Sequence, residues 1–74
     1  MREYLKKLRE EKGLTMQEVA EKLGISKQYY SLIEGGERQR KMDITLVKSL
    51  SEVFGIPLER VANEENKLFE SITV

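Results

Sequence analysis

Residues 15–34 carry the local signals for two short helices joined by a tight turn. Thr15 followed by Glu18 makes a capping box, in which the hydroxyl and the carboxylate each accept a hydrogen bond from an amide at the start of a helix. Gly24 can adopt the left-handed conformation that ends a helix, because it has no Cβ. The first helix of the pair is therefore predicted to begin at Thr15 and to end at Gly24.

The second helix of the pair is predicted from about Lys27 to Glu34. Ser26 is a favourable N-cap, and Tyr30 and Ile33 share one face that turns inward. Ala20 on the first helix presents only a methyl group, so the two helices can approach closely. Two short crossed helices of this kind form a helix-turn-helix, an arrangement that binds the major groove of DNA. The residues left to face outward from the second helix are Lys27, Gln28, Tyr29, Ser31 and Leu32.

The rest of the chain predicts further short helices, four or five in all, and an all-α fold. Residues 2–12 place Leu5 and Leu8 on one face, and Gly13 follows. Asp43 is the N-cap of another helix that Gly55 ends. Its expected inward face comprises Ile44, Val47, Leu50, Ser51 and Phe54, and a last helix after Pro57 turns Leu58, Val61 and Ala62 inward. Seventy-four residues suffice for one compact domain.

Residues 63–74 allow two structures. Val61, Leu68 and Ile72 share a face if the last helix continues, whereas residues 67–74 alternate as a strand would and end in β-branched side chains. We expect helix to about Asn66, followed by an extended or mobile end. The apolar side chains of this segment, Leu68, Phe69 and Ile72, need cover, which either the chain's own core or a partner subunit can supply.

The composition excludes several classes of function. The chain has neither cysteine nor histidine, so disulfides and the usual zinc sites are absent, and no nucleophile, base and orienting group converge as in an enzyme. We expect no cofactor, no metal and no small-molecule substrate. No signal peptide and no apolar run of the roughly 20 residues that span a membrane is seen, which indicates a soluble, cytoplasmic protein without a membrane partner.

The charge is balanced in number but not in distribution. Thirteen basic residues match thirteen acidic ones, whereas a DNA-binding domain is expected to have a basic surface. Residues 1–42 hold ten basic and seven acidic side chains, and residues 43–74 hold three basic and six acidic ones. The electric field of this uneven charge distribution would orient the protein on a polyanion.

The arrangement resembles the small helix-turn-helix domain of the phage repressor, Cro and Xre family. The resemblance spans residues 2–62 and rests on Leu5 and Leu8, the block of residues 15–34, Gly36, and the sequence Phe-Gly-Ile-Pro-Leu at residues 54–58. It implies a lambda-repressor-like bundle of five short helices, formed by residues 1–62, with residues 63–74 as a C-terminal extension that serves as a dimerisation element or mobile tail. It also implies a homodimer that sets its third helix into the major groove of a palindromic operator.

The resemblance also assigns contacts. Lys27, Gln28, Tyr29 and Leu32 match the positions that contact bases: lysine can donate to guanine, glutamine can pair with adenine, and leucine can meet a thymine methyl. The expected phosphate contacts are Gln17, Ser26, Ser31, Arg38, Arg40 and Lys41. Met16, Gly35 and Glu37 depart from residues frequent in the family. The losses at Met16 and Glu37 imply weak affinity for DNA, unless Arg38, Arg40 and Lys41 compensate.

Two hypotheses for the function follow. The first is a sequence-specific regulator of transcription that binds double-stranded DNA, and a repressor rather than an activator, because repression needs only occupancy of a promoter. The alternative is a protein-interaction or antitoxin-like module that uses the same scaffold and binds a partner through the C-terminal tail. Glu34, at the end of the second helix of the pair, is expected to bond a neighbouring backbone group or an arginine rather than to act in function.

Overall fold

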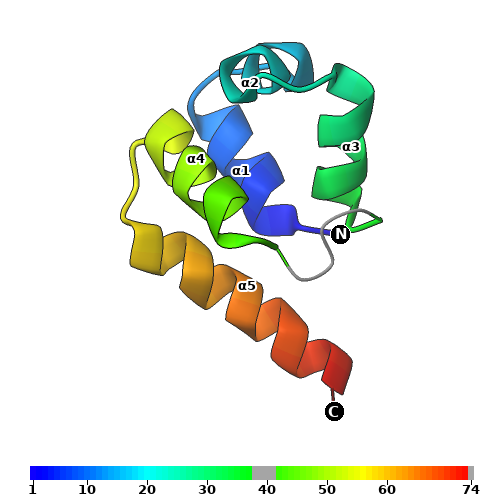
Figure 1. Cartoon of the computed structure of the whole chain (residues 1–74), viewed down its shortest axis with the longest axis vertical. Coiled ribbons are helices and arrows are strands. Elements are labelled where there is room, and N and C mark those ends of the chain that lie inside the picture. Colours follow the sequence, from blue (N-terminus) through cyan, green and yellow to red (C-terminus); the bar gives the residue numbers. More distant parts are fainter. Residues whose placement is uncertain (38–41, 74) are drawn as a thin grey trace. The chain divides into compact units, whose positions relative to one another are not determined.

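A computed structural model describes residues 1–37 and 42–73, with side chains as far as Leu68. These residues form five helices and no strand (Figure 1), so the predicted all-α fold is confirmed. The helices are α1 (Glu3–Glu11), α2 (Met16–Leu23), α3 (Lys27–Gly35), α4 (Ile44–Phe54) and α5 (Leu58–Thr73). The chain divides into two compact units, Met1–Arg40 with α1 to α3 and Lys41–Val74 with α4 and α5.

The helix boundaries of the first unit follow the predicted caps. At the start of α2, the Thr15 hydroxyl accepts from the Glu18 amide at 3.1 Å, and the Glu18 carboxylate accepts from the Thr15 amide at 3.0 Å. Gly24 ends α2 in the left-handed region with φ 74°. At the start of α3, the Ser26 hydroxyl accepts from the Tyr29 amide at 3.0 Å. The turn between α2 and α3 is therefore fixed by residues within it.

Apolar side chains of all three helices are buried in the first unit. α2 and α3 pack against each other, and α1 contacts α3. Ala20 is fully buried, as expected for a residue that lets two helices approach closely. The buried apolar residues are Leu5, Leu8, Val19, Ala20, Tyr30 and Ile33. Because Tyr30 and Ile33 face inward, the opposite side of α3 lies at the surface.

The second unit pairs α4 with α5. Asp43 caps α4 by accepting from the Leu46 amide at 2.8 Å. The prediction is wrong for two residues that were expected to face inward, because Ile44 is 71% exposed and Leu58 is 38% exposed. Each is the first residue of its helix, where the apolar stripe extends beyond the surface it packs on. The buried residues of this unit are Val47, Leu50, Phe54 and Val61.

The C-terminal segment is helical further than expected. α5 continues to Thr73, so the predicted change to an extended end after Asn66 is wrong. No glycine or proline interrupts residues 58–73, and Lys67 forms an ion pair of 3.2 Å with Glu64 one turn earlier. The helical period of the apolar residues therefore outweighed the β-branched end. Within the described residues, no helix has the length and apolar character needed to cross a membrane.

Candidate nucleic-acid interface

The outer face of α3 is the candidate interface. Lys27, Gln28 and Ser31 are exposed, and Leu32 is half-buried between them and the interior. These four residues line an open hollow of about 370 Å³. The half-buried leucine contributes an apolar side chain to the lining, and the other three residues contribute amide, hydroxyl and ammonium groups. Such a surface can meet a base-pair edge, which presents both methyl and polar groups.

The start of α3 is suited to an anion. Ser26 is exposed, and its hydroxyl oxygen accepts from the Tyr29 amide, which leaves the hydroxyl proton available to a further acceptor. The first amides of a helix lie at the positive end of its dipole. Lys27 adds a positive charge at this end, whereas Glu34 lies at the other end of α3. The beginning of α3 is therefore the more favourable end for phosphate.

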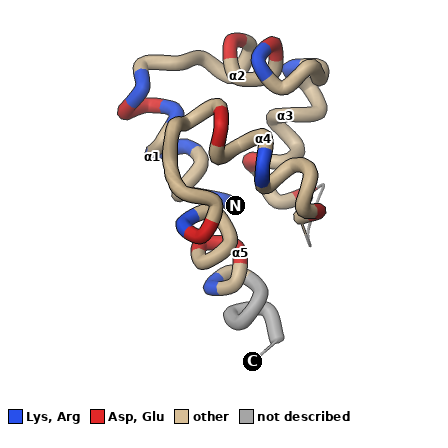
Figure 2. Tube along the Cα trace, turned by 60° about the vertical axis from the view of Figure 1, so that its left-hand side comes forward, with Lys and Arg blue, Asp and Glu red and all other residues tan. Residues whose placement is uncertain are grey.

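The start of α2 is less suited to an anion, because its own carboxylates occupy it. Glu18 accepts the Thr15 amide there, and the hydrogen bonds from the backbone and hydroxyl of Thr15 lower the pKa of Glu18. Gln17, the neighbour of Glu18, donates to the carboxylate of Glu21 one turn further along α2, with 3.0 Å between Nε2 and Oε1. The predicted phosphate contact Gln17 is thus exposed but is engaged by an acidic neighbour. Figure 2 shows acidic and basic residues mixed along α2.

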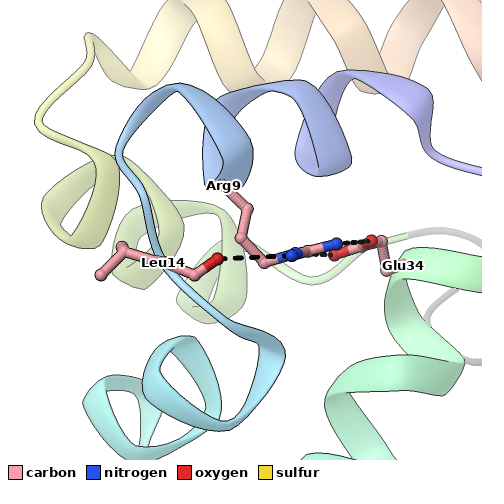
Figure 3. Close-up of polar contacts among 3 residues, drawn as sticks. All are labelled: Arg9, Leu14 and Glu34. Atoms are coloured by element: carbon pink, nitrogen blue, oxygen red, sulfur yellow. Dashed lines mark hydrogen bonds and ion pairs between the residues drawn. The ribbon is translucent and has the colours of Figure 1, made fainter.

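An ion pair holds the end of α3 to α1. The Arg9 guanidinium makes two hydrogen bonds to the Glu34 carboxylate, at 3.0 and 3.1 Å, and a third to the Leu14 carbonyl at 3.3 Å (Figure 3). Glu34 is only 1% exposed, so its charge depends on this partner. The bond to Glu34 raises the pKa of Arg9. The expectation that Glu34 bonds an arginine is confirmed.

Tyr30 is buried beside this pair. Burial, followed by the nearby Glu34 carboxylate, raises its pKa above the ordinary value of 10.0. Its hydroxyl group makes no hydrogen bond of acceptable geometry with any described residue. Tyr30 therefore contributes to α3 mainly through the packing of its ring.

Arg2 is a second arginine at the end of α3, and the sequence analysis did not identify it. It is 3% exposed; its amide donates to the Glu34 carbonyl at 2.8 Å, and its guanidinium donates to the Ile33 carbonyl. An arginine in the first residues of a chain is ordinarily solvated, and no local motif signals its burial. The long sequence separation from Ile33 hides this contact from any periodicity argument.

Comparison with known proteins agrees with this geometry. A family model described as "Helix-turn-helix" matches residues 5–61, a span that includes α1 to α4 nearly in full. The chain belongs to this helix-turn-helix family, of the phage repressor, Cro and Xre type. It is also 43% identical over 68 residues to the "Uncharacterized HTH-type transcriptional regulator YqaF" of Bacillus subtilis (strain 168), covering 86% of this chain and 87% of the relative. No solved structure matches the chain with significance.

In this helix-turn-helix protein, α3 is the second helix of the helix-turn-helix pair. The structure brings the predicted base-contacting residues Lys27, Gln28 and Leu32 together around one hollow, with Tyr29 half-buried beside them. Ser26 and Ser31 are exposed at the same helix, whereas Gln17 lies on α2. The predicted phosphate contacts Arg38, Arg40 and Lys41 lie outside the described residues. In the part that is described, no three metal-ligating side chains come together. The family is one of DNA-binding regulators rather than of enzymes.

Proposed function

We propose that the protein is a sequence-specific transcriptional regulator that binds double-stranded DNA, as a homodimer on a palindromic operator, and that it acts as a repressor. The observation that carries this proposal is the outer face of α3, where four side chains with the chemistry of base contacts surround one open hollow. The printed name of the Bacillus subtilis relative, an HTH-type transcriptional regulator, supports it. The cytoplasmic location expected from the composition belongs to the same proposal.

Three of the four residues that line the hollow have a complementary group in the major groove. Lys27 can donate to O6 and N7 of guanine, and Gln28 can exchange two hydrogen bonds with adenine. The side chain of Leu32 has no polar atom and fits the C5 methyl group of thymine. The proposed operator half-site therefore contains a guanine, an adenine and a thymine at neighbouring positions.

The phosphate contribution is proposed to be modest. Ser26 and Ser31 are neutral donors, and the carboxylates of Glu18 and Glu21 lie along α2. Affinity for DNA of any sequence depends on the number of phosphates that cations neutralise. The protein therefore depends more on base contacts, and on a second protomer, than a strongly basic domain would.

The small size of one recognition helix supports the proposed homodimer. α3 has nine residues, and one such helix contacts only a few base pairs. Two copies that present α3 to successive major grooves, about 34 Å apart, double the contacted sequence. Repression is the simpler outcome because occupancy of a promoter is enough.

Selection from a library of random duplexes tests this proposal. The expected result is a palindromic consensus, with two protomers per duplex in sedimentation velocity. The combined variant Lys27→Ala and Gln28→Ala should lose the sequence preference, whereas the control Lys48→Ala, which removes an exposed lysine from α4, should retain it. The proposal fails if no sequence is enriched at low salt, or if the double variant selects the same consensus.

The same experiment addresses the alternative, a protein-interaction or antitoxin-like module. Such a module would show no enriched sequence. It would also tolerate Lys27→Ala and Gln28→Ala without a change in its partner binding, because its partner would contact the C-terminal tail rather than α3. Enrichment of a consensus that depends on α3 is the outcome that separates the two.

A further inference from the structure

The last turn of α3 is held by backbone contacts to the first residues of the chain. The Arg2 amide donates to the Glu34 carbonyl at 2.8 Å, and its guanidinium donates to the Ile33 carbonyl. These carbonyls lie at the negative end of the helix dipole, where a positive charge is stabilising. In Figure 1, the N-terminus lies beside this end of α3.

The turn that follows α3 completes the arrangement. The Gly36 amide donates to the Ile33 carbonyl at 3.1 Å, and the Glu37 amide donates to the Leu32 carbonyl at 2.9 Å. A Cβ added at Gly36 would lie 3.6 Å from the Met1 nitrogen, so the first residue lies against this turn. The carbonyls of Leu32, Ile33 and Glu34 are therefore each bonded, and Arg2 supplies bonds to two of them.

Arg2 constrains α3 in a way that Arg9 does not. Arg9 bonds the Glu34 carboxylate, which is separated from the helix backbone by rotatable bonds. The backbone can shift while that ion pair adjusts. Arg2 bonds the backbone of α3 itself, through both its amide and its guanidinium, and it is a buried residue, only 3% exposed. Movement of Arg2 away from α3 would therefore break two bonds to the helix backbone and open the interior.

The direction of this axis determines where the outward side chains lie. The start of α3 is fixed by the short turn from α2, so a loosened end would pivot about that turn. Leu32 lies five residues along α3 from Lys27, which is about 7.5 Å at 1.5 Å per residue. A tilt of about 10° displaces Leu32 by about 1 Å relative to Lys27, whereas functional side chains must be held to about 0.5 Å. Leu32 is affected more than Lys27.

We propose that Arg2 is a positioning residue of the DNA interface, which sets the angle of α3 without contacting DNA. This inference rests on the proposed function. Because Arg2 is buried and its guanidinium donates to the Ile33 carbonyl, the guanidinium is not available to a phosphate. Arg2 acts on the specificity of the base contacts, most of all at the base pair that meets Leu32.

The test compares Arg2→Gln with Lys7→Gln, a control that removes an exposed charge from α1, the helix that Arg2 precedes. Binding to the selected operator and to a scrambled duplex is measured over a range of salt, at a temperature at which circular dichroism shows both variants folded. Arg2→Gln should bind the operator about tenfold more weakly, as expected for loss of a hydrogen bond from a charged group. Preference at the base pair facing Leu32 should fall most, and the salt dependence should stay unchanged.

Other outcomes overturn the inference. A fall in the salt slope of about 0.9 per protomer would make Arg2 a phosphate contact. A lower melting temperature with unchanged operator preference would make its role purely structural. If the unaltered protein has no sequence preference at all, the proposed function fails and this inference fails with it, whereas an unaltered protein with a clear preference isolates the effect of Arg2.

A second variant covers the case in which Arg2→Gln does not fold. Arg2→Lys keeps a donor and the charge, so it should recover part of the preference. Hydrogen exchange at the amides of Gly36 and Glu37, which bond the last turn of α3, should be faster in Arg2→Lys than in the unaltered protein. Unchanged exchange together with unchanged preference would overturn the inference.

Discussion

Removal of Arg9 tests how the fold tolerates a buried charge. In Arg9→Ala, the Glu34 carboxylate keeps its buried position, 1% exposed, but loses both hydrogen bonds of the guanidinium. Breaking a buried pair by removing one partner costs about 3–5 kcal/mol, because the remaining charge is uncompensated. A chain of this size has a free energy of unfolding of about 4–11 kcal/mol. Arg9→Ala should therefore consume a large part of the stability.

Removal of both charges should cost much less. In the double variant Arg9→Met and Glu34→Leu, no carboxylate has to be desolvated, and apolar side chains fill the space. Replacement of a buried ion pair in this way is often neutral or stabilising. We expect the double variant to lie within about 1 kcal/mol of the unaltered protein, although it loses the bond from Arg9 to the Leu14 carbonyl.

Urea unfolding followed by the helical circular dichroism signal measures these differences. Glu10→Ala is the matched control, because Glu10 is the exposed neighbour of Arg9 on α1 and its loss should change stability by less than about 0.5 kcal/mol. An exposed ion pair contributes at most about 1 kcal/mol to stability. The reasoning is refuted if Arg9→Ala lowers the free energy of unfolding by no more than this amount. It is also refuted if the double variant is as unstable as Arg9→Ala.

Four further predictions concern single groups. Hydrogen bonds from Thr15 lower the pKa of Glu18 below 4.5. Their contribution to the stability of the fold is therefore present above pH 4.5 and is lost as the pH falls below it. In Glu18→Gln, the melting temperature should decline less steeply in acid. Because the pKa of Tyr30 is raised, its neutral hydroxyl contributes to the stability of the fold below pH 10.0, and this contribution is lost as the pH rises above that value. In Tyr30→Phe, the free energy of unfolding measured in urea should no longer show this loss at alkaline pH. Gly24→Ala should lower the free energy of unfolding by about 1–2 kcal/mol, through backbone strain at φ 74° rather than a clash. Deoxyuridine in place of the thymidine that we propose meets Leu32 should weaken binding in a fluorescence titration about fourfold, the value of one buried methyl.

The parts of the fold that were predictable are those encoded within a few residues. The capping box at Thr15, the N-caps at Ser26 and Asp43 and the glycine that ends α2 all depend on contacts between near neighbours, and all are confirmed. Sequence periodicity also separated the inward from the outward residues of α3. The candidate interface was therefore predictable by elimination, once the buried positions were assigned.

The remaining features depend on residues far apart in the chain. The partners of Arg2 and Arg9 lie 31 and 25 residues away, and no periodic pattern connects them. The apolar period placed Ile44 on an inward stripe but could not show where that stripe runs past the surface it covers. The bond between Gln17 and Glu21 is different, because an i to i+4 pair on a helix is visible in the sequence.

The residues of α3 divide into two groups that share no side chain. Those that anchor the helix, among them Tyr30, Ile33 and Glu34, lie on one side, and those that border the hollow lie on the other. Natural drift or a designed library can therefore exchange the second group without disturbing the first. A single scaffold could in this way supply a set of orthogonal binders, each directed to a different promoter.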